Sequence, residues 1–208
     1  MTANVTPTVA VLFAQARTHY RSLPGVEVWD RRRDARGYPG PYPVVAHPPC
    51  RVYSRYLSKQ AKAPPDEYTL AIFAVAAVRA YGGVLEHPRI SKLWDRCGLP
   101  PPGESDAWGF TIEIWQWWFG YPGGKKRTWL YCCGVHPDDL PPIPYRLWTP
   151  GDHERWQLLS RAARSKTPPA LCEWLVSVAR LCGRVISPRN DRVHFESPED
   201  AQYESKTM

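Results

Sequence analysis

The sequence predicts an α/β fold built on a Rossmann-like parallel sheet, and three observations support this prediction. Short apolar runs of the kind that buried parallel strands show recur in the first half of the chain. They lie at residues 9–14, 26–30, 44–46 and 84–85. A segment with apolar residues on helical spacing begins after Asp66 and ends at Gly82, between the third and fourth runs. Because such crossovers are right-handed, these two runs should form neighbouring parallel strands.

Composition indicates one domain with a basic surface. The 208 residues predict a single α/β catalytic domain over residues 1–186 and a polar tail over residues 187–208. The net charge of +7 favours an anionic partner such as nucleic acid. The six cysteines form no C-x-x-C pair, and no apolar run approaches the ~20 residues that span a bilayer. We therefore expect reduced thiols, a cytoplasmic location and no membrane partner.

Two reactive side chains follow the third and fourth runs. The third run stops at His47 and is followed by Pro48, Pro49 and Cys50, and the fourth run leads directly into Glu86. Ligands bind at the carboxyl ends of the strands in open α/β sheets. The sequence therefore predicts that a thiol and a carboxylate meet over one cleft.

These residues carry a family resemblance. Pro49-Cys50 followed by Ser54, then a helix, then Glu86-His87-Pro88 resembles the catalytic core of the DNA cytosine-5 methyltransferases. In that family the cysteine attacks C6 of the base and the glutamate holds N3. The resemblance implies these two roles for Cys50 and Glu86, on a methyltransferase-type sheet.

Two later segments extend the resemblance in the order of the family. Residues 119–127 are similar to its Pro-Gln-x-Arg-x-Arg block, whose last arginine holds the base carbonyl O2 and corresponds to Arg127. Strand patterns at 110–118 and 128–133 flank this block, so we expect a hairpin. Residues 166–171 resemble the last motif, a polar and proline turn before a helix beside the cofactor, which we expect over residues 170–181.

The resemblance implies a complete set of site residues and a cofactor. The catalytic residues would be Cys50, Glu86 and Arg127. The cofactor, S-adenosylmethionine, would contact Phe13, Asp30, Pro48 and Thr167. The substrate, DNA or a pyrimidine nucleotide, would contact Ser54, His87, Lys125 and Lys126. We expect no metal.

The chain departs from the family in three places. The loop at residues 15–20 has no glycine where the family has a glycine-rich cofactor loop, and it carries Arg17 and His19 instead. Pro49 follows Asp30 by only nineteen positions, so the N-terminal cofactor half should be abbreviated. About thirty residues at 135–165 stand in place of a large target-recognition domain. A protein partner could supply target recognition.

Several functions remain open at this stage. The first is a minimal DNA cytosine-5 methyltransferase. The second is a relative that uses another donor or acts on a 5-hydroxymethyl pyrimidine, and the third is a catalytically silent nucleic-acid-binding module. A Cys-His protease using Cys50 with His47 or His87, and a zinc site at residues 132–136, are weaker alternatives. The arginines of residues 31–36 should join Lys125 and Lys126 in one basic surface.

Overall fold

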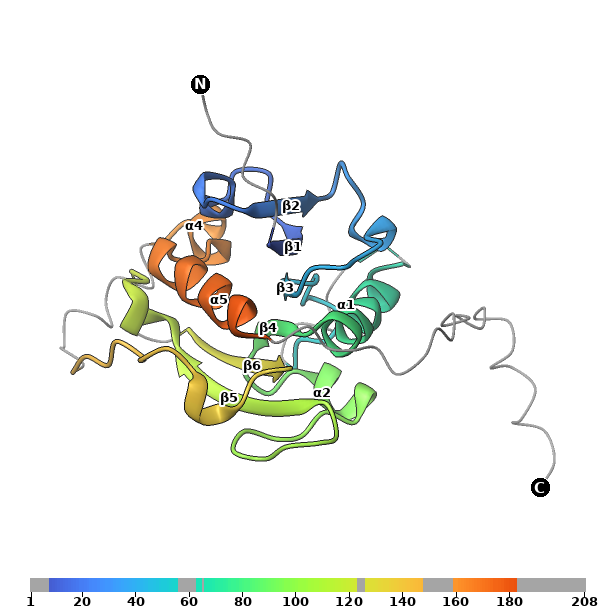
Figure 1. Cartoon of the computed structure of the whole chain (residues 1–208). Helices are drawn as coiled ribbons and strands as arrows, with labels where there is room; N and C mark the ends of the chain where they lie inside the picture. Colours follow the sequence, from blue (N-terminus) through green and yellow to red (C-terminus); the bar gives the residue numbers. More distant parts are fainter. Residues whose placement is uncertain (1–7, 56–62, 65, 123–125, 148–158, 183–208) are drawn as a thin grey trace.

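The computed structural model describes residues 8–55, 63–64, 66–122, 126–147 and 159–182. It has an α/β fold, as predicted, with one mixed sheet of six strands between helices (Figure 1). The predicted polar tail and Lys125 lie outside the described residues.

The sheet has the strand order β2-β1-β3-β4-β6-β5. Its strands are β1 Val9–Ala14, β2 Val26–Asp30, β3 Val44–Ala46, β4 Gly83–Pro88, β5 Gly109–Trp115 and β6 Arg127–Cys133. Strands β2, β1, β3 and β4 pair in parallel, whereas β6 pairs antiparallel with both β4 and β5. The predicted parallel neighbours β3 and β4, and the predicted hairpin of β5 and β6, are confirmed.

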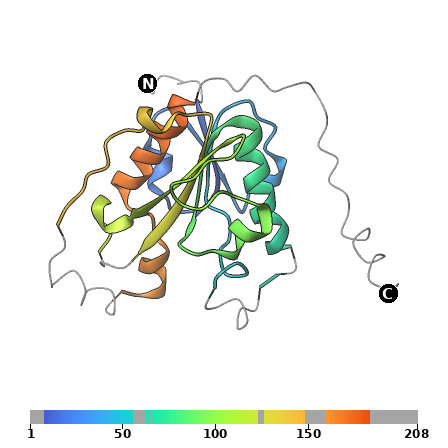
Figure 2. The ribbon, with the colours of Figure 1, turned by 90° about the horizontal axis from the view of Figure 1, so that it is seen from below.

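Helices cover both faces of the sheet (Figures 1 and 2). The helices are α1 Glu67–Tyr81, α2 Lys92–Cys97, α4 Arg161–Ser165 and α5 Pro169–Leu181. Short 3-10 turns are η1 His19–Ser22, η2 Ala35–Gly37, η3 Gln116–Phe119 and η4 Pro137–Asp139. None of the helices that the structure describes is long and apolar enough to cross a membrane.

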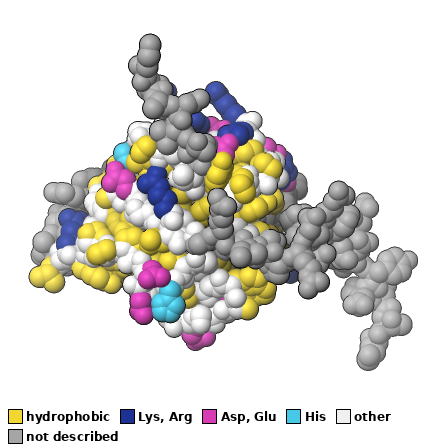
Figure 3. Space-filling model, in the orientation of Figure 1, with side chains coloured by type: hydrophobic (Ala, Val, Ile, Leu, Met, Phe, Trp, Pro, Cys, Tyr) yellow, Lys and Arg dark blue, Asp and Glu magenta, His cyan; other side chains and the backbone are white. Residues whose placement is uncertain are grey.

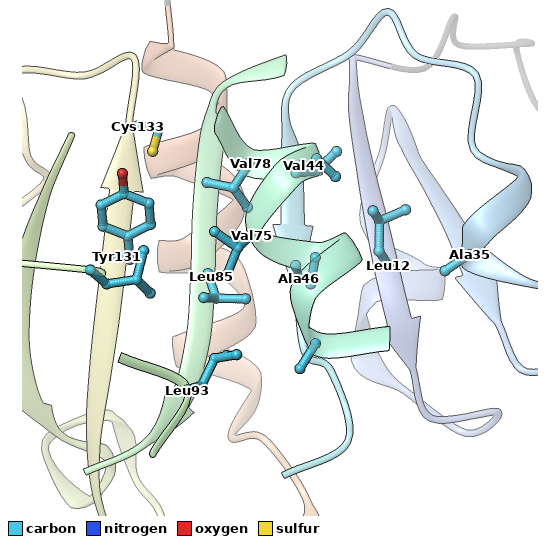
Figure 4. Close-up of a cluster of buried hydrophobic side chains, with 14 of the residues drawn as sticks. Leu12, Ala35, Val44, Ala46, Val75, Val78, Leu85, Leu93, Tyr131 and Cys133 are labelled. Atoms are coloured by element: carbon cyan, nitrogen blue, oxygen red, sulfur yellow. The ribbon is translucent and has the colours of Figure 1, made fainter. Parts of the chain in front are cut away.

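Two apolar layers hold the helices on the sheet. Leu12, Ala46 and Leu85 of the parallel strands pack with Val75 and Val78 of α1 on one face (Figure 4). The alternate residues of the same strands face α5. Because successive strand residues point to opposite faces, a sheet that is covered on both sides needs the continuous apolar runs that the sequence shows.

Glycines let β4 start directly after α1. Gly82 ends the helix with a φ of 74°, and Gly83 follows with a φ of 116°. A Cβ atom on Gly83 would lie 1.9 Å from the carbonyl oxygen of Val44, so a side chain there would collide with β3. This close approach lets the amino ends of β3 and β4 pair directly.

The connection from β2 to β3 is short. The chain passes from β2 to β3 through η2 alone, and β2 is one of the two edge strands of the sheet. The predicted strand over 110–118 is wrong at its end, because pairing with β6 stops at Trp115 and the chain turns into η3. The alternating pattern there belongs partly to a buried turn, in which Gln116, Trp117 and Phe119 face inward.

Candidate active site

Cys50 lies in the turn that follows β3. The main-chain amide of His47 donates to the carbonyl of Leu12 at 3.0 Å and ties this segment to the end of β1. The amide of Tyr53 donates to the Cys50 carbonyl at 3.2 Å and closes the turn. Of the six cysteines of the chain, Cys50 is exposed, Cys97 is partly exposed and the other four are buried. A thiol that reacts with an external molecule needs this access.

Cys50 and Glu86 line one cleft at the carboxyl ends of β3 and β4. This cleft has a volume of about 510 Å³, and Lys126 also lines it. A neighbouring cavity of about 480 Å³ shares these three residues. Of the predicted site residues, the larger cleft adds Phe13, Pro48 and Thr167, and the smaller adds Ser54, His87 and Arg127. The predicted meeting of a thiol and a carboxylate over one cleft is confirmed.

A network of hydrogen bonds fixes the carboxylate of Glu86. Oε2 contacts Nδ1 of His47 at 3.2 Å, and Oε1 accepts from Nε2 of Gln116 at 2.9 Å. The hydroxyl of Thr128 also contacts Oε1, as well as the main-chain carbonyl of His87 at 2.7 Å. These partners come from the β3 turn, η3 and β6, so three separate segments position one side chain.

The surroundings of Glu86 favour its ionised form. Burial alone would raise the pKa of this carboxyl, but the hydrogen bond and charge of His47, together with Lys126 and Thr128, lower the pKa to about 2. The pKa of the Cys50 thiol is raised, first by desolvation in the cleft and then by Glu86, while Lys126 opposes the rise. At neutral pH the cleft therefore holds a carboxylate, and Lys126 is the cation that favours a thiolate.

Lys126 faces the same side of the sheet as Glu86. The Gln116 amide donates to the Lys126 carbonyl at 2.9 Å and continues the pairing of β5 and β6 by one residue. Side chains two positions apart on a strand share a face, so Lys126 lies on the side of Thr128, which contacts Glu86. Its ammonium group donates to the Lys166 carbonyl at 3.3 Å and lies 4.9 Å from the ring centre of Tyr121.

The guanidinium group of Arg127 is bound by residues of β5. It forms an ion pair with Glu113 of β5, and its guanidinium carbon lies 4.8 Å from the ring centre of Trp115. Glu113 also accepts from Nε1 of Trp129 at 2.8 Å, on the sheet face that α1 and α2 cover. The role at O2 that the resemblance implies for Arg127 stays a prediction, and the adjacent Lys126 is the cation that faces Glu86.

His87 is a buried positioning residue. Its side chain has no exposed surface, and its Nδ1 lies 2.7 Å from the hydroxyl of Ser91, the N-cap residue of α2. Burial lowers the pKa of this imidazole to about 4. Because the imidazole is enclosed, we assign it to holding the turn between β4 and α2 rather than to the direct substrate contact that the resemblance implies.

This burial predicts a pH dependence of stability. The unfolded chain binds a proton at His87 below the ordinary pKa of 6.5, whereas the folded chain does so only below about 4. Stability should therefore fall as the pH drops from 6.5 to 4, by about 3 kcal/mol from this residue. Urea unfolding at several pH values measures the slope, which should flatten in His87→Asn and persist in His136→Asn, a variant at an exposed histidine. An unchanged slope in His87→Asn would contradict the assignment.

Asp30, the predicted ribose ligand, accepts three hydrogen bonds through its carboxylate. Oδ2 accepts from Arg21 at 2.6 Å, and Oδ1 accepts from the amides of Arg32 and Arg33 at 2.9 and 3.3 Å. The amide of Arg32 is the largest of the influences that lower the pKa of this carboxyl. Asp30 does not line the cleft of Cys50 but a separate cavity of about 520 Å³.

Phe13 lies between these two cavities and lines both. It has a φ of 61°, which is strained for a residue with a side chain, and the register of β1 and β2 shifts at this point. Its ring meets Phe73 of α1 edge to face with 6.3 Å between centroids. A bulge thus occupies the strand end at which the family has its glycine loop.

The loop after β1 is held by its own side chains. Nε2 of Gln15 donates to the Ser165 carbonyl at 3.0 Å, and Nε2 of His19 lies 2.9 Å from a carboxylate oxygen of Glu173 on α5. The Tyr20 hydroxyl is 2.8 Å from Nε2 of His47. These contacts connect the loop to α5 and to the network around Glu86.

The basic surface beside the cleft differs from the predicted one. Within residues 31–36, Arg33 pairs with Glu27, and Arg36 pairs with Asp34 and Asp66. These arginines lie away from the cleft of Cys50, which instead has four cationic side chains in its lining. They are Arg17, Lys126, Arg164 and Lys166. On the face drawn in Figure 3, Lys and Arg side chains form separate groups rather than one continuous stripe.

The weaker alternatives find no support in this geometry. Among the described residues, no hydrogen bond joins Cys50 to His47 or to His87. Cys132 and Cys133 are buried on opposite faces of the sheet, and the described part of the chain holds no group of three potential metal ligands.

The sequence patterns do not predict the network that surrounds Glu86. They indicate His47 only as the possible partner of a protease-like cysteine, and they assign no role to Tyr20, Gln116 or Thr128. The one available signal was a histidine three residues before the predicted nucleophile. Comparison of the chain with family models, with curated proteins and with solved structures finds no match.

Proposed function

We propose that the chain is an enzyme that modifies C5 of a pyrimidine base through a covalent adduct at Cys50, in the manner of the DNA cytosine-5 methyltransferases. The observation that carries this proposal is the cleft in which an exposed thiol, an ionised carboxylate and an ammonium group meet at the carboxyl ends of two parallel strands. The order of the motifs along the sequence supports it independently.

The chemistry requires a nucleophile and a means to stabilise charge. The thiolate of Cys50 adds to C6, and the electrons of the C5–C6 double bond make C5 nucleophilic enough to accept a one-carbon group. Glu86 orients the ring at N3, and Lys126 offers a positive charge to the electron density that the addition creates. Loss of the C5 proton and departure of the thiolate then restore the aromatic ring.

Exchange of the C5 hydrogen tests the proposal without knowledge of the donor. In D2O, addition of Cys50 to C6 lets C5 take up a deuteron, and elimination then releases the original hydrogen. We expect the protein to label C5 of a pyrimidine in single-stranded DNA or in a free nucleotide, as measured by mass spectrometry. Folded wild-type protein that exchanges no pyrimidine in either form would overturn the proposal.

A donor other than S-adenosylmethionine is the second candidate, and a specific observation favours it. S-Adenosylmethionine would need a tightly turning loop after β1 and a free acidic group after β2. The loop instead has Gln15 bound to the Ser165 carbonyl, and Asp30 is engaged by Arg21. Four cationic side chains in the cleft lining suit a more anionic donor.

Calorimetric titration separates the two donors. We expect S-adenosylmethionine to bind with a dissociation constant above the micromolar range. The strained Phe13, and the loop that Gln15 ties to the Ser165 carbonyl, stand where the cofactor would need a glycine turn. Arg21→Ala serves as a control, since it frees the Oδ2 oxygen of Asp30 and should tighten any ribose contact. Micromolar binding together with methyl transfer that depends on Cys50 would reject the altered donor.

A further inference from the structure

The smaller cavity beside Cys50 has a surplus of positive charge. Among the described residues, its lining contains one carboxylate, Glu86, and four cationic side chains. They are Arg55, Arg89, Lys126 and Arg127. Lys126 offsets the charge of Glu86, which it helps to keep ionised, so the arginines remain in excess. An anionic group that approaches the thiol from this side is therefore attracted.

Arg89 and Arg127 are neighbours at the ends of β4 and β6. The main-chain amide of Arg89 donates to the Arg127 carbonyl at 3.2 Å and continues the pairing of these strands by one residue. Both guanidinium groups contact Glu113 of β5, since Nε of Arg89 donates to Oε2 at 3.0 Å and Arg127 pairs with Oε1. Glu113 itself lies outside the lining of the cavity, so the arginines stand between this carboxylate and the ligand space.

This arrangement fixes Arg89 and leaves it able to bind a second anion. Glu113 neutralises one of two positive charges, and its carboxylate is only 18% exposed and accepts from Nε1 of Trp129 at 2.8 Å. The side chain of Arg89 is 42% exposed. A guanidinium group has five N–H donors, and the hydrogen bond to Oε2 uses one of them. A fixed guanidinium group at a cavity wall suits a phosphate, which it can meet with two parallel hydrogen bonds.

We propose, on the basis of the proposed function, that Arg89 binds a phosphate group of the target nucleotide in the smaller cavity, and that Glu113 is the positioning residue for its guanidinium group. The base then lies where the two cavities meet at Cys50, and the larger cleft is left to the donor. The substrate is accordingly a phosphorylated pyrimidine, as a free nucleotide or within a single strand, rather than a nucleoside.

The test compares exchange of the C5 hydrogen in deoxycytidine and in its 5′- and 3′-monophosphates, with deoxyuridine and its monophosphates in parallel. For one of the two bases we expect kcat/KM of a monophosphate to exceed that of the nucleoside by about 100-fold, mainly through a lower KM. In Arg89→Ala this ratio should fall by about 10-fold or more, the usual effect of losing a hydrogen bond between charged groups. Both substrates are measured in one protein sample, so a loss of folded protein leaves the ratio unchanged.

Three further variants locate the phosphate. Glu113→Gln keeps the size of the side chain but removes the charge that holds Arg89, so the ratio should fall here too. A purely structural Glu113 would lower the free energy of unfolding and keep the ratio, which would overturn its positioning role. Arg96→Ala, at an exposed arginine of α2 outside the cavity, should keep the wild-type ratio. A ratio that is lost in Arg17→Ala, on the larger cleft, and kept in Arg89→Ala would overturn the proposed site.

Trinucleotides distinguish the two sources of the phosphate. In d(TCT) and d(TUT) only the central base has a hydrogen at C5. If a strand is the source, the trinucleotide should exchange faster than the monophosphates, and uncharged methylphosphonate linkages should remove the gain. If a free nucleotide is the source, the monophosphate should exchange faster.

The outcomes for the phosphate site and for the proposed function are separable. Equal exchange of nucleoside and nucleotides by the wild type would overturn the phosphate site and leave the proposed function standing. If no form exchanges, the proposed function fails, and calorimetric titration with dCMP and dUMP then decides the site. Binding that Arg89→Ala weakens by about 10-fold would support the site. Absent binding, or binding that this variant leaves unchanged, would overturn it as well.

Discussion

Cys50→Ser should reduce exchange of the C5 hydrogen by roughly 10⁴-fold or more, because a serine hydroxyl is almost never ionised at neutral pH and cannot add to C6. The residue is exposed at the cleft, so the free energy of unfolding should change little. Mass spectrometry of the labelled base measures the first effect, and urea unfolding measures the second.

Cys97→Ser is the matched control for this variant. Cys97 ends α2 and is also partly exposed, but it does not line the cleft. We expect this variant to keep the wild-type exchange rate. Exchange that survives in Cys50→Ser and is lost in Cys97→Ser would remove Cys50 from the mechanism.

Lys126→Ala should slow exchange by roughly 10²-fold, the usual loss when one charge-stabilising contact is removed from a site. Lys126 lowers the pKa of both Cys50 and Glu86, so its removal should also raise the pH at which the Cys50 thiol becomes reactive. The pH dependence of alkylation by iodoacetamide measures this shift without any substrate. Lys126→Arg keeps the positive charge, so its exchange rate and the pH at which its thiol becomes reactive should both lie between those of the wild type and of Lys126→Ala.

Arg127→Ala tests the role that the family resemblance implies. The guanidinium group is paired with Glu113 on the sheet face that α1 and α2 cover, so we expect a smaller loss of exchange than in Lys126→Ala. The thiol should become reactive at the same pH as in the wild type. If Arg127→Ala loses more exchange than Lys126→Ala, and Lys126→Ala has little effect, then Arg127 and not Lys126 is the catalytic cation.

The sequence is sufficient to predict the parts of the site that are built by segments adjacent in the chain. The apolar run of β3, the helical spacing of α1 and the glycines before β4 predict a crossover, and a crossover places Cys50 beside Glu86. The short connection between β2 and β3 also follows from counting residues between Asp30 and Pro49. Both predictions need only local patterns and the handedness of one connection.

The sequence does not determine whether Lys126 or Arg127 faces the cleft with Glu86. Adjacent residues of a strand point to opposite faces, so a shift of one position exchanges Lys126 for Arg127. The sequence pattern near the hairpin turn does not fix this register. Pairing of Trp115 with Arg127 and the bond from the Gln116 amide to Lys126 decide it.

Local sequence patterns are enough to predict the α/β fold, the parallel pairing of β3 and β4, and a thiol and a carboxylate at the ends of these strands. The surroundings of Glu86 follow only from the packing of η3, β6 and the β3 turn, with Tyr20 of η1 behind His47. These contacts join residues that lie between 27 and 42 positions apart in the chain. No periodicity within one segment encodes such contacts, because they arise when separate elements pack against the same strand end and their side chains converge there.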